Sequence, residues 1–244
     1  MEAEITGMKM SLLEKYQEFL VDNTRPGFQT VHLSLSAEGW KLLIRENLTP
    51  IIENELHMKQ INDYTWADEY KDGKRRVLSF FFATSDMSAT FKWGWNFDFV
   101  PKYSGGKIVW ARTDKSIYTH IFEVFPENYQ GKKDKIMMSR GIIDIKNLEM
   151  RLDERISQHK YVFYRLLPFM TEYYSSVDSY EQILKRIDHD MENSYYRLIN
   201  GACMWVTKIF IEKRMGMQEK AMQDFEELNF GSEKAKDAYL KKLL

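Results

Sequence analysis

Six polar residues in the first half of the chain have side chains suited to acid–base or metal chemistry, and all fall on neighbouring predicted strands. They are Asp68, Glu69, Lys92, Asn96, Asp98 and His120. Asp98 is the centre of the set, because Asp68 and Glu69 can approach it across a predicted hairpin. Converging carboxylates with a histidine can hydrolyse a bond or hold a catalytic metal ion. One hypothesis is therefore a hydrolase or a metal-dependent nuclease with a dispersed carboxylate site.

The same residues have a simpler interpretation. Lys92, Asn96 and Asp98 alternate with aromatic residues, so they share one face of a strand. An antiparallel sheet commonly packs one face on the core and turns the other to water. We favour this solvated polar face, and a structural role for His120, while the binding or catalytic interpretation stays open.

Recognisable catalytic and cofactor motifs are missing from the sequence. The five histidines form no H-E-x-x-H or other close metal-ligand pair, and no glycine-rich phosphate or dinucleotide loop is present. The one cysteine, Cys203, lies in an apolar segment typical of a buried small hydrophobe rather than of a reactive thiol. We therefore expect no cofactor and no metal, and catalytic activity is the less favoured outcome.

An aromatic stripe has the clearest periodicity in the chain. Its members are Phe91, Trp93, Trp95, Phe97 and Phe99. The period of two predicts a strand with one aromatic face, which either forms the core or presents a stacking platform for bases or sugars. We favour the core, with the stripe packed on helices; the platform would require Trp93 and Trp95 to be exposed.

The charge balance argues against a dedicated nucleic-acid binder. Lys and Arg number 35 and Asp and Glu number 36, which leaves a formal net charge of −1, whereas nucleic-acid binders carry a basic surplus. The compact basic groups, residues 74–76 and 132–135, are interpreted as solubilising surface charges. A local basic patch remains an alternative.

Helical spacing predicts an amphipathic helix over residues 8–23 and a second helix capped by Ser36. Pro50 ends or kinks that second helix near residues 48–49, with a short continuation over residues 51–56. Asp72-Gly73 and Gly105-Gly106 predict tight turns between strands. The strands are expected at 61–70, 76–83, 91–99, 107–112 and 116–124.

The second half of the chain has helical periodicity. Residues 128–135 read as a boundary loop, and Pro168 disturbs the pattern of the helix expected over residues 161–174. The other helices are expected around residues 148–156, 180–187, 193–215, 218–228 and 232–244. Strands and helices are segregated, which predicts an α+β fold with an antiparallel sheet of four or five strands packed against helices. Residues 1–130 would hold the sheet and residues 131–244 the helices, packed as one unit.

The number of cysteines and the hydropathy of the chain indicate the cellular compartment of the protein. A single cysteine excludes an intramolecular disulfide, and the acidic start MEAEITGMKM has no apolar signal region. The most apolar stretch, residues 202–211, is too short to cross a bilayer. We expect a cytoplasmic protein with no membrane association.

Several segments resemble a bacterial family without an assigned function, domain-of-unknown-function family 4304. They are LLIRENLTPIIENEL, YTWADEY, RVLSFFFATSDMSATFKWGWNFDFVP and SSVDSYEQILKRI, with EKAMQDFEEL near the end. The similarity covers roughly residues 37–230 in pattern and layout. It implies an α+β fold and carries over no catalytic residue. By analogy, some proteins of this build accompany bacterial toxins or defence systems as binding partners.

Together these features predict a non-catalytic interaction module of a bacterial cytoplasm, whose partner is another protein. The family resemblance adds immunity or defence as one role for such a module. The sequence does not specify the oligomeric state.

Overall fold

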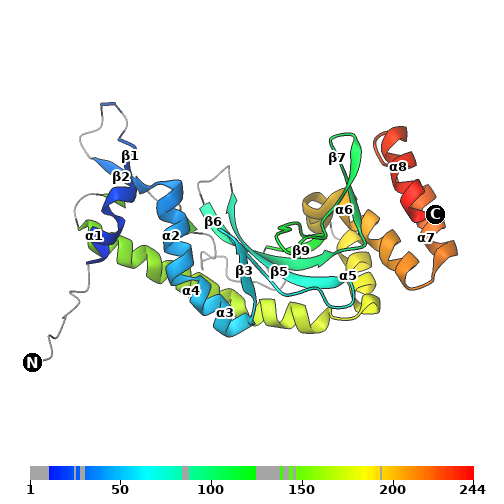
Figure 1. Cartoon of the computed structure of the whole chain (residues 1–244), viewed down its shortest axis with the longest axis horizontal. Coiled ribbons are helices and arrows are strands. Elements are labelled where there is room, and N and C mark those ends of the chain that lie inside the picture. Colours follow the sequence, from blue (N-terminus) through cyan, green and yellow to red (C-terminus); the bar gives the residue numbers. More distant parts are fainter. Residues whose placement is uncertain are drawn as a thin grey trace, which may run out of the picture.

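The computed structural model describes residues 11–24, 26–27, 31–83, 88–124, 138–139, 143–144, 147–192 and 194–244. The molecule is elongated, with the large sheet in the middle and the first helices at one end (Figure 1). Helices α7 (Gln218–Glu227) and α8 (Glu233–Leu243) lie at the other end. Strands and helices are segregated, so the α+β fold is confirmed. The boundary loop predicted at residues 128–135 and the side chain of Cys203 lie outside the described residues.

The N-terminal helix is shorter than its periodicity predicts. Helix α1 (Leu12–Tyr16) starts at a capping box between Ser11 and Glu14, continues as a 3₁₀ turn (Gln17–Phe19) and gives way to strand β1 (Leu20–Asp22). Strand β1 pairs with β2 (His32–Leu35), which also pairs with β11 (Ile143–Asp144). The prediction of one helix over residues 8–23 was wrong because strand pairing overrides the amphipathic pattern.

Two short helices follow, as the capping signals predict. Helix α2 (Ala37–Asn47) begins at Ser36, whose side chain accepts a hydrogen bond from the amide of Gly39. Helix α3 (Thr49–Leu56) carries its proline in the first turn, where a missing amide costs little. The two helices are thus separated at Leu48, as Pro50 predicts.

Among the described residues the large sheet contains six strands, and every pair of neighbouring strands there is antiparallel. The order is β10 (Met138–Ser139), β6 (Ser88–Phe97), β5 (Lys74–Ala83), β4 (Thr65–Ala67) and β3 (Lys59–Asn62), with β9 (Ile121–Glu123) also paired to β6. The single strand predicted over residues 61–70 is split into β3 and β4. The split has a local cause, because the side chain of Asn62 accepts a hydrogen bond from the amide of Tyr64 and turns the chain.

Both glycine turns occur where the sequence places them. Asp72 and Gly73 have φ angles of 51° and 77°. Gly105 and Gly106, at 58° and 80°, join β7 (Pro101–Ser104) to β8 (Lys107–Trp110) in a separate hairpin. The strand expected over residues 116–124 is limited to β9.

Helix α4 (Leu148–Ser176) is one continuous helix of 29 residues that includes Pro168, so the expected separation into two helices was wrong. The helices α5 (Tyr180–Glu192), α6 (Ser194–Arg214), α7 (Gln218–Glu227) and α8 (Glu233–Leu243) follow the predicted spacing. Within the described part of the chain, none of these helices combines the length and apolarity needed to cross a membrane.

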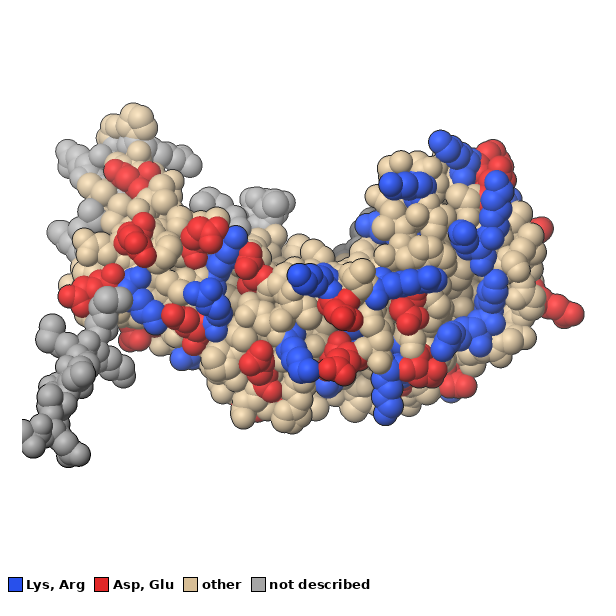
Figure 2. All heavy atoms as spheres, viewed as in Figure 1, with Lys and Arg blue, Asp and Glu red and all other residues tan. Residues whose placement is uncertain are grey.

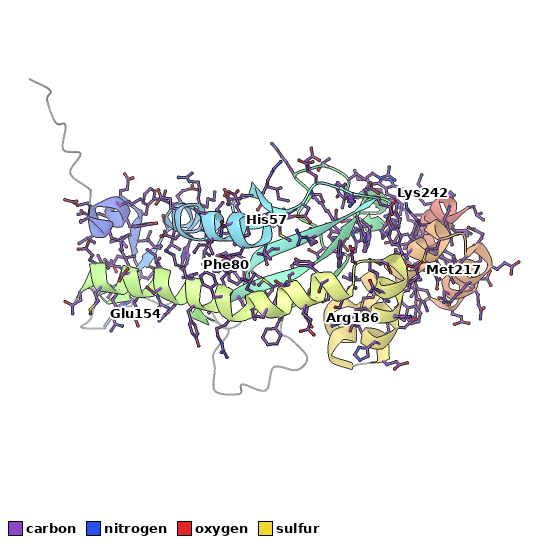
Figure 3. All side chains as sticks on the ribbon, turned by 90° about the horizontal axis from the view of Figure 1, so that it is seen from below. His57, Phe80, Glu154, Arg186, Met217 and Lys242 are labelled. Carbon is purple, nitrogen blue, oxygen red and sulfur yellow. The ribbon has the colours of Figure 1, made fainter. Side chains whose placement is uncertain are left out.

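The core lies between α4 and the aromatic face of the sheet. Figure 3 shows α4 running along the sheet, close to Phe80. Phe91 contacts Phe163 with ring centroids 5.6 Å apart, and Trp95 contacts Tyr174 at 5.9 Å. The stripe therefore anchors the sheet to a helix, as favoured above, although Phe99 lies beyond β6 and is only half-buried. Because Trp93 and Trp95 are buried, the stacking platform is excluded.

Strand β9 is the antiparallel neighbour of β6 in the sheet, with Gly94 opposite Phe122. The two strands approach so closely there that a Cβ on Gly94 would lie 2.0 Å from the carbonyl oxygen of Ile121. Glycine is therefore required at position 94.

Candidate functional site

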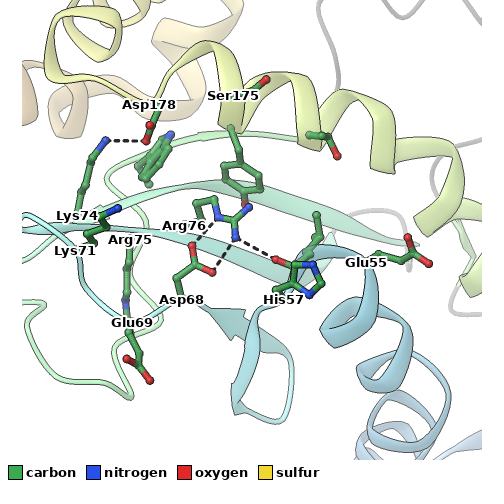
Figure 4. A pocket seen from close by; sticks show the side chains of 14 residues that line it. Glu55, His57, Asp68, Glu69, Lys71, Lys74, Arg75, Arg76, Ser175 and Asp178 are labelled. Atoms are coloured by element: carbon green, nitrogen blue, oxygen red, sulfur yellow. Dashed lines mark hydrogen bonds and ion pairs between the residues drawn. The ribbon is translucent and has the colours of Figure 1, made fainter.

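A cleft of about 410 Å³ opens between the end of α3, the turn before β5 and the last turns of α4 (Figure 4). It is open to solvent along one side. The cleft combines charged groups from the sheet with hydroxyl and aromatic groups from α4. Its lining comprises Glu55, Leu56, His57, Asp68, Glu69, Lys71, Lys74, Arg75, Arg76, Trp95, Thr171, Tyr174, Ser175 and Asp178.

Arg76 and Asp68 form the best-ordered ion pair in the cleft. Nε of Arg76 donates to Oδ2 of Asp68 at 2.6 Å, and Nη2 donates to Oδ1 at 3.0 Å. Nη2 also donates to the carbonyl of Leu56 at 3.0 Å, where the left-handed backbone of His57 ends α3. Nη1 makes no hydrogen bond to the residues that the structure describes. The Nε–Nη2 edge of this guanidinium is thus fixed, and Nη1 is available to donate a hydrogen bond to a ligand.

Lys74 occupies the inner end of the cleft. Its Nζ lies 2.9 Å from Oδ1 of Asp178 and 4.9 Å from the centre of the Trp95 ring. Lys74 and Arg76 share a face of β5 because side chains alternate along a strand. Arg75 points to the other face, where Nη1 donates to the carbonyl of Asp114 at 3.0 Å and the side chain is almost fully buried. The interpretation of residues 74–76 as solubilising surface charges was therefore wrong.

Two aromatic side chains form the inner wall. The hydroxyl of Tyr174 donates to the carbonyl of Val77 at 2.9 Å, and burial raises the pKa of Tyr174 well above its ordinary value. Trp95 is buried, and its Nε1–H finds no acceptor among the described residues. Tyr174 thus stays a neutral, anchored phenol, and the wall offers a rigid apolar surface next to the cations.

Of the six residues selected from the sequence, only Asp68 and Glu69 line the cleft. Glu69 lies at its exposed rim, with Oε1 2.8 Å from Nζ of Lys59. The hydrogen bond from Lys59 lowers the pKa of Glu69. Both candidate carboxylates of the cleft are therefore ion-paired.

Asn96 and His120 form a separate buried network. Nδ1 of His120 accepts a hydrogen bond from the amide of Phe97 at 3.0 Å, so the proton is assigned to Nε2, which donates to the carbonyl of Val100 at 3.1 Å. Nδ2 of Asn96 lies 3.4 Å from the same Nδ1, and Oδ1 of Asn96 contacts the hydroxyl oxygen of Tyr70. Burial lowers the pKa of His120 to about 3, so the ring is neutral near pH 7.

Lys92 and Asp98 belong to neither group. Lys92 lies 4.9 Å from the ring of Phe122, and burial lowers its pKa. Asp98 is partly exposed beside Gly73, and its backbone carbonyl accepts a hydrogen bond from Nε of Arg112 at 2.6 Å. The convergence of Asp98 with the other candidates, which the enzyme hypothesis requires, is not found among the described contacts.

The polar face of β6 is less solvated than the sequence predicts. Asn96 is fully buried and Arg75 is 2% exposed. The cause is the segment around residues 111–120, which folds over this face and supplies carbonyl acceptors to Tyr70 and Arg75. Sequence periodicity indicates which side chains share a face, and it does not indicate that a distant segment covers them.

Sequence reasoning also missed Lys74, Arg76, Trp95 and Tyr174 as cleft residues. One signal was present, because Asp68 and Arg76 flank a predicted hairpin turn from opposite sides. The contribution of α4 could not be found in this way, since Tyr174 lies almost 100 residues further along the chain.

The described residues contain no group of three His, Cys, Asp or Glu side chains placed to hold a metal ion. Comparisons with family models, curated proteins and solved structures found no match to this chain. The similarity to domain-of-unknown-function family 4304 therefore stays a prediction.

Proposed function

We propose that this chain is a non-catalytic binding module that captures another protein at the cleft between α3, β5 and α4. The observation that supports the proposal is the pairing of three of the four cleft carboxylates. Asp68, Glu69 and Asp178 each contact a cation, and the fourth, Glu55, is exposed to solvent. A general base or nucleophile needs a carboxylate free to take a proton or attack, whereas paired charges beside aromatic rings suit recognition.

The groups that remain available in the cleft are mostly hydrogen-bond donors. Nη1 of Arg76 is uncommitted, and Lys71 has no ion pair with the described residues. Tyr174 and Trp95 lie next to them. Arginine is one of the residues that most often dominate the energy of protein interfaces. The buried rings of Tyr174 and Trp95 support the cations Arg76 and Lys74 from behind. A partner segment that carries a carboxylate next to an apolar side chain would satisfy both features.

The shape of the cleft also favours a macromolecule over a small molecule as its ligand. It is open along one side, so it can accept a loop or terminus that projects from a larger protein. Small-molecule sites instead bury most of their ligand.

A crosslinking experiment tests the proposal. A photo-reactive amino acid replaces Ser175, which is exposed and lines the cleft, and in a second protein it replaces Glu219, which is exposed on α7. Each protein is irradiated in lysate of its source organism. Lys71→Glu reverses an exposed charge of the cleft, and Lys115→Glu makes the same change at an exposed site outside it.

We expect one protein to crosslink from position 175 and not from position 219. Lys71→Glu should reduce this product at least about tenfold, which corresponds to about 1.4 kcal/mol, and Lys115→Glu should leave it unchanged. Equal crosslinking from both positions, or no response to Lys71→Glu, contradicts the proposal. Native mass spectra that show a small molecule or a metal in place of a partner would favour the hydrolase or nuclease.

A bacterial cytoplasm as location and a role in immunity or defence are parts of the same proposal. The single cysteine supports a reducing compartment. The link to defence rests on the analogy drawn from the family resemblance.

A further inference from the structure

A second cavity lies at the other end of the molecule and is independent of the cleft. It measures about 210 Å³ and is lined by residues of β7, the approach to β9, α6, and α8 with the connection that precedes it. The lining comprises Val100, Pro101, Lys102, Tyr103, Tyr118, His120, Val206, Leu228, Asn229, Phe230, Ala235 and Tyr239. It is more enclosed than the cleft.

Several aromatic rings line this cavity, and contacts with their neighbours fix them in place. Phe230 and Tyr239 contact each other with ring centroids 5.4 Å apart, and the hydroxyl of Tyr239 accepts a hydrogen bond from the amide of Tyr103 at 2.7 Å. Tyr118 packs edge-on against His120 at 4.7 Å. Rings of this kind favour a planar aromatic guest through offset and edge-to-face contacts.

Charge in the cavity has one sign. None of the twelve lining residues is Asp or Glu, and His120 is held neutral by its burial and by the hydrogen bond that its Nδ1 accepts from the amide of Phe97. Lys102 is exposed, lies with Nζ 4.4 Å from the centre of the Tyr118 ring and has no ion pair with the described residues. Figure 2 shows lysine and arginine side chains spread over this end of the molecule, with acidic side chains between them.

A second donor lies on the rim. Oδ1 of Asn229 accepts a hydrogen bond from the amide of Gly231 at 2.9 Å, which fixes the side-chain amide. Nδ2 of Asn229 donates to none of the described residues. A carboxylate at the rim can therefore pair with Lys102 and accept a hydrogen bond from Asn229.

The volume limits the size of the guest. An apolar cavity of roughly 150 Å³ admits a benzene molecule, so about 210 Å³ accommodates one six-membered ring with a small substituent. We propose that this cavity is a binding site for a small aromatic carboxylate, whose ring lies among Tyr118, Phe230 and Tyr239 and whose carboxylate meets Lys102.

Benzoate and benzamide are the probes, because they have the same shape and differ in charge. Binding to the full chain is measured by calorimetry and by amide chemical shifts. We expect benzoate to bind at least about fivefold more tightly than benzamide, with the largest shifts at Phe230 and Tyr239. Lys102→Met should remove this preference, and Lys107→Met, a matched exposed change on β8, should keep it.

Ala235→Leu places a larger side chain in the buried wall and should abolish binding of both probes. If this variant does not fold, the shift map of the unmodified chain still decides the question. Absence of binding at millimolar concentration, shifts confined to other surfaces, or equal affinity for the two probes would each overturn the proposal. The outcome is separate from the crosslinking result, because the two sites share no residue.

Discussion

Arg76 binds Asp68 with two parallel hydrogen bonds from Nε and Nη2, and its guanidinium also contacts α3 and α4. Nη2 reaches the carbonyl of Leu56 at 3.0 Å, and the guanidinium carbon lies 5.3 Å from the centre of the Tyr174 ring. One side chain of β5 thus contacts α3, the β4–β5 connection and α4. Such an arrangement makes Arg76 a structural member of the cleft as well as a candidate ligand group.

Removal of the negative charge of Asp68 should destabilise the fold. Asp68→Asn weakens two charge-assisted hydrogen bonds and leaves a partly buried cation without a counter-ion, so the free energy of unfolding should fall by about 1–2 kcal/mol. Urea unfolding followed by circular dichroism measures the change. Glu69→Gln is the matched control and should leave the urea midpoint unchanged, because that pair is fully exposed. Equal effects of the two substitutions would contradict this account.

Gly94→Ala should be far more disruptive than its size suggests. The added methyl group meets the backbone carbonyl of Ile121, which cannot rotate away as a side chain would. Overpacking of this kind should cost about 3 kcal/mol or more, or prevent folding. Ser104→Ala, a small change at an exposed strand position, is the control for the yield of soluble protein and for the melting temperature. A melting temperature within 2–3 °C of the parent would show that β9 moves away readily.

Two buried histidines should make stability depend on pH. Burial lowers the pKa of His120 to about 3 and that of His159 to about 4, whereas both have an ordinary value of 6.5. Between these values the unfolded chain binds more protons than the folded chain. Stability should therefore be fully present above pH 6.5 and should decrease as the pH falls, by about 1 kcal/mol per pH unit for each histidine.

Urea midpoints measured between pH 7.5 and pH 4.5 test this dependence. His120→Gln should reduce the slope of stability against pH, even though it also lowers stability at pH 7. A slope that His120→Gln does not alter would mean that the histidine is not the group responsible. His159→Gln tests the second histidine in the same way.

Pro168 should be a site where substitution stabilises the protein. Proline inside a helix lacks the amide that would bond to the carbonyl of Tyr164, and its ring crowds that carbonyl. Since Pro168 is exposed, Pro168→Ala restores the bond without loss of core contacts and should add about 1–2 kcal/mol to the free energy of unfolding. Thr171→Ala, three residues further along the same exposed face, controls for helix propensity. A lower stability of Pro168→Ala would indicate that the proline packs on another part of the chain.

The parts of the fold that follow from local chemistry could be predicted from sequence. Ser36 caps its helix as its position indicates, and Asp72 and Gly73 adopt the left-handed backbone that a tight turn requires. The aromatic stripe forms the core, because a period of two with large rings on one side has few other solutions.

The parts that depend on distant contacts could not be predicted. Residues 20–22 have a helical pattern and become a strand because β2 offers hydrogen bonds. Pro168 is a strong signal to end a helix, yet buried residues before and after it, such as Phe163 and Met170, keep α4 continuous. The prediction of the candidate site was incomplete for the same reason. Asn96 and His120 were candidate members of a site around Asp98. The structure brings these two side chains together, and the segment that buries them is not visible in their own spacing.

The position of α4 has a consequence for how the protein is made. Trp95 and Phe91 are synthesised about 70 residues before the Tyr174 and Phe163 side chains that cover them. The backbone amide of Leu12 at the start of α1 likewise waits for its acceptor, Glu149. On the ribosome, the first half of the chain must therefore persist with a large apolar sheet face exposed to other nascent chains. Early contact with a chaperone is the requirement that follows, and a pause in translation before codon 148 would prolong the interval in which aggregation competes with folding.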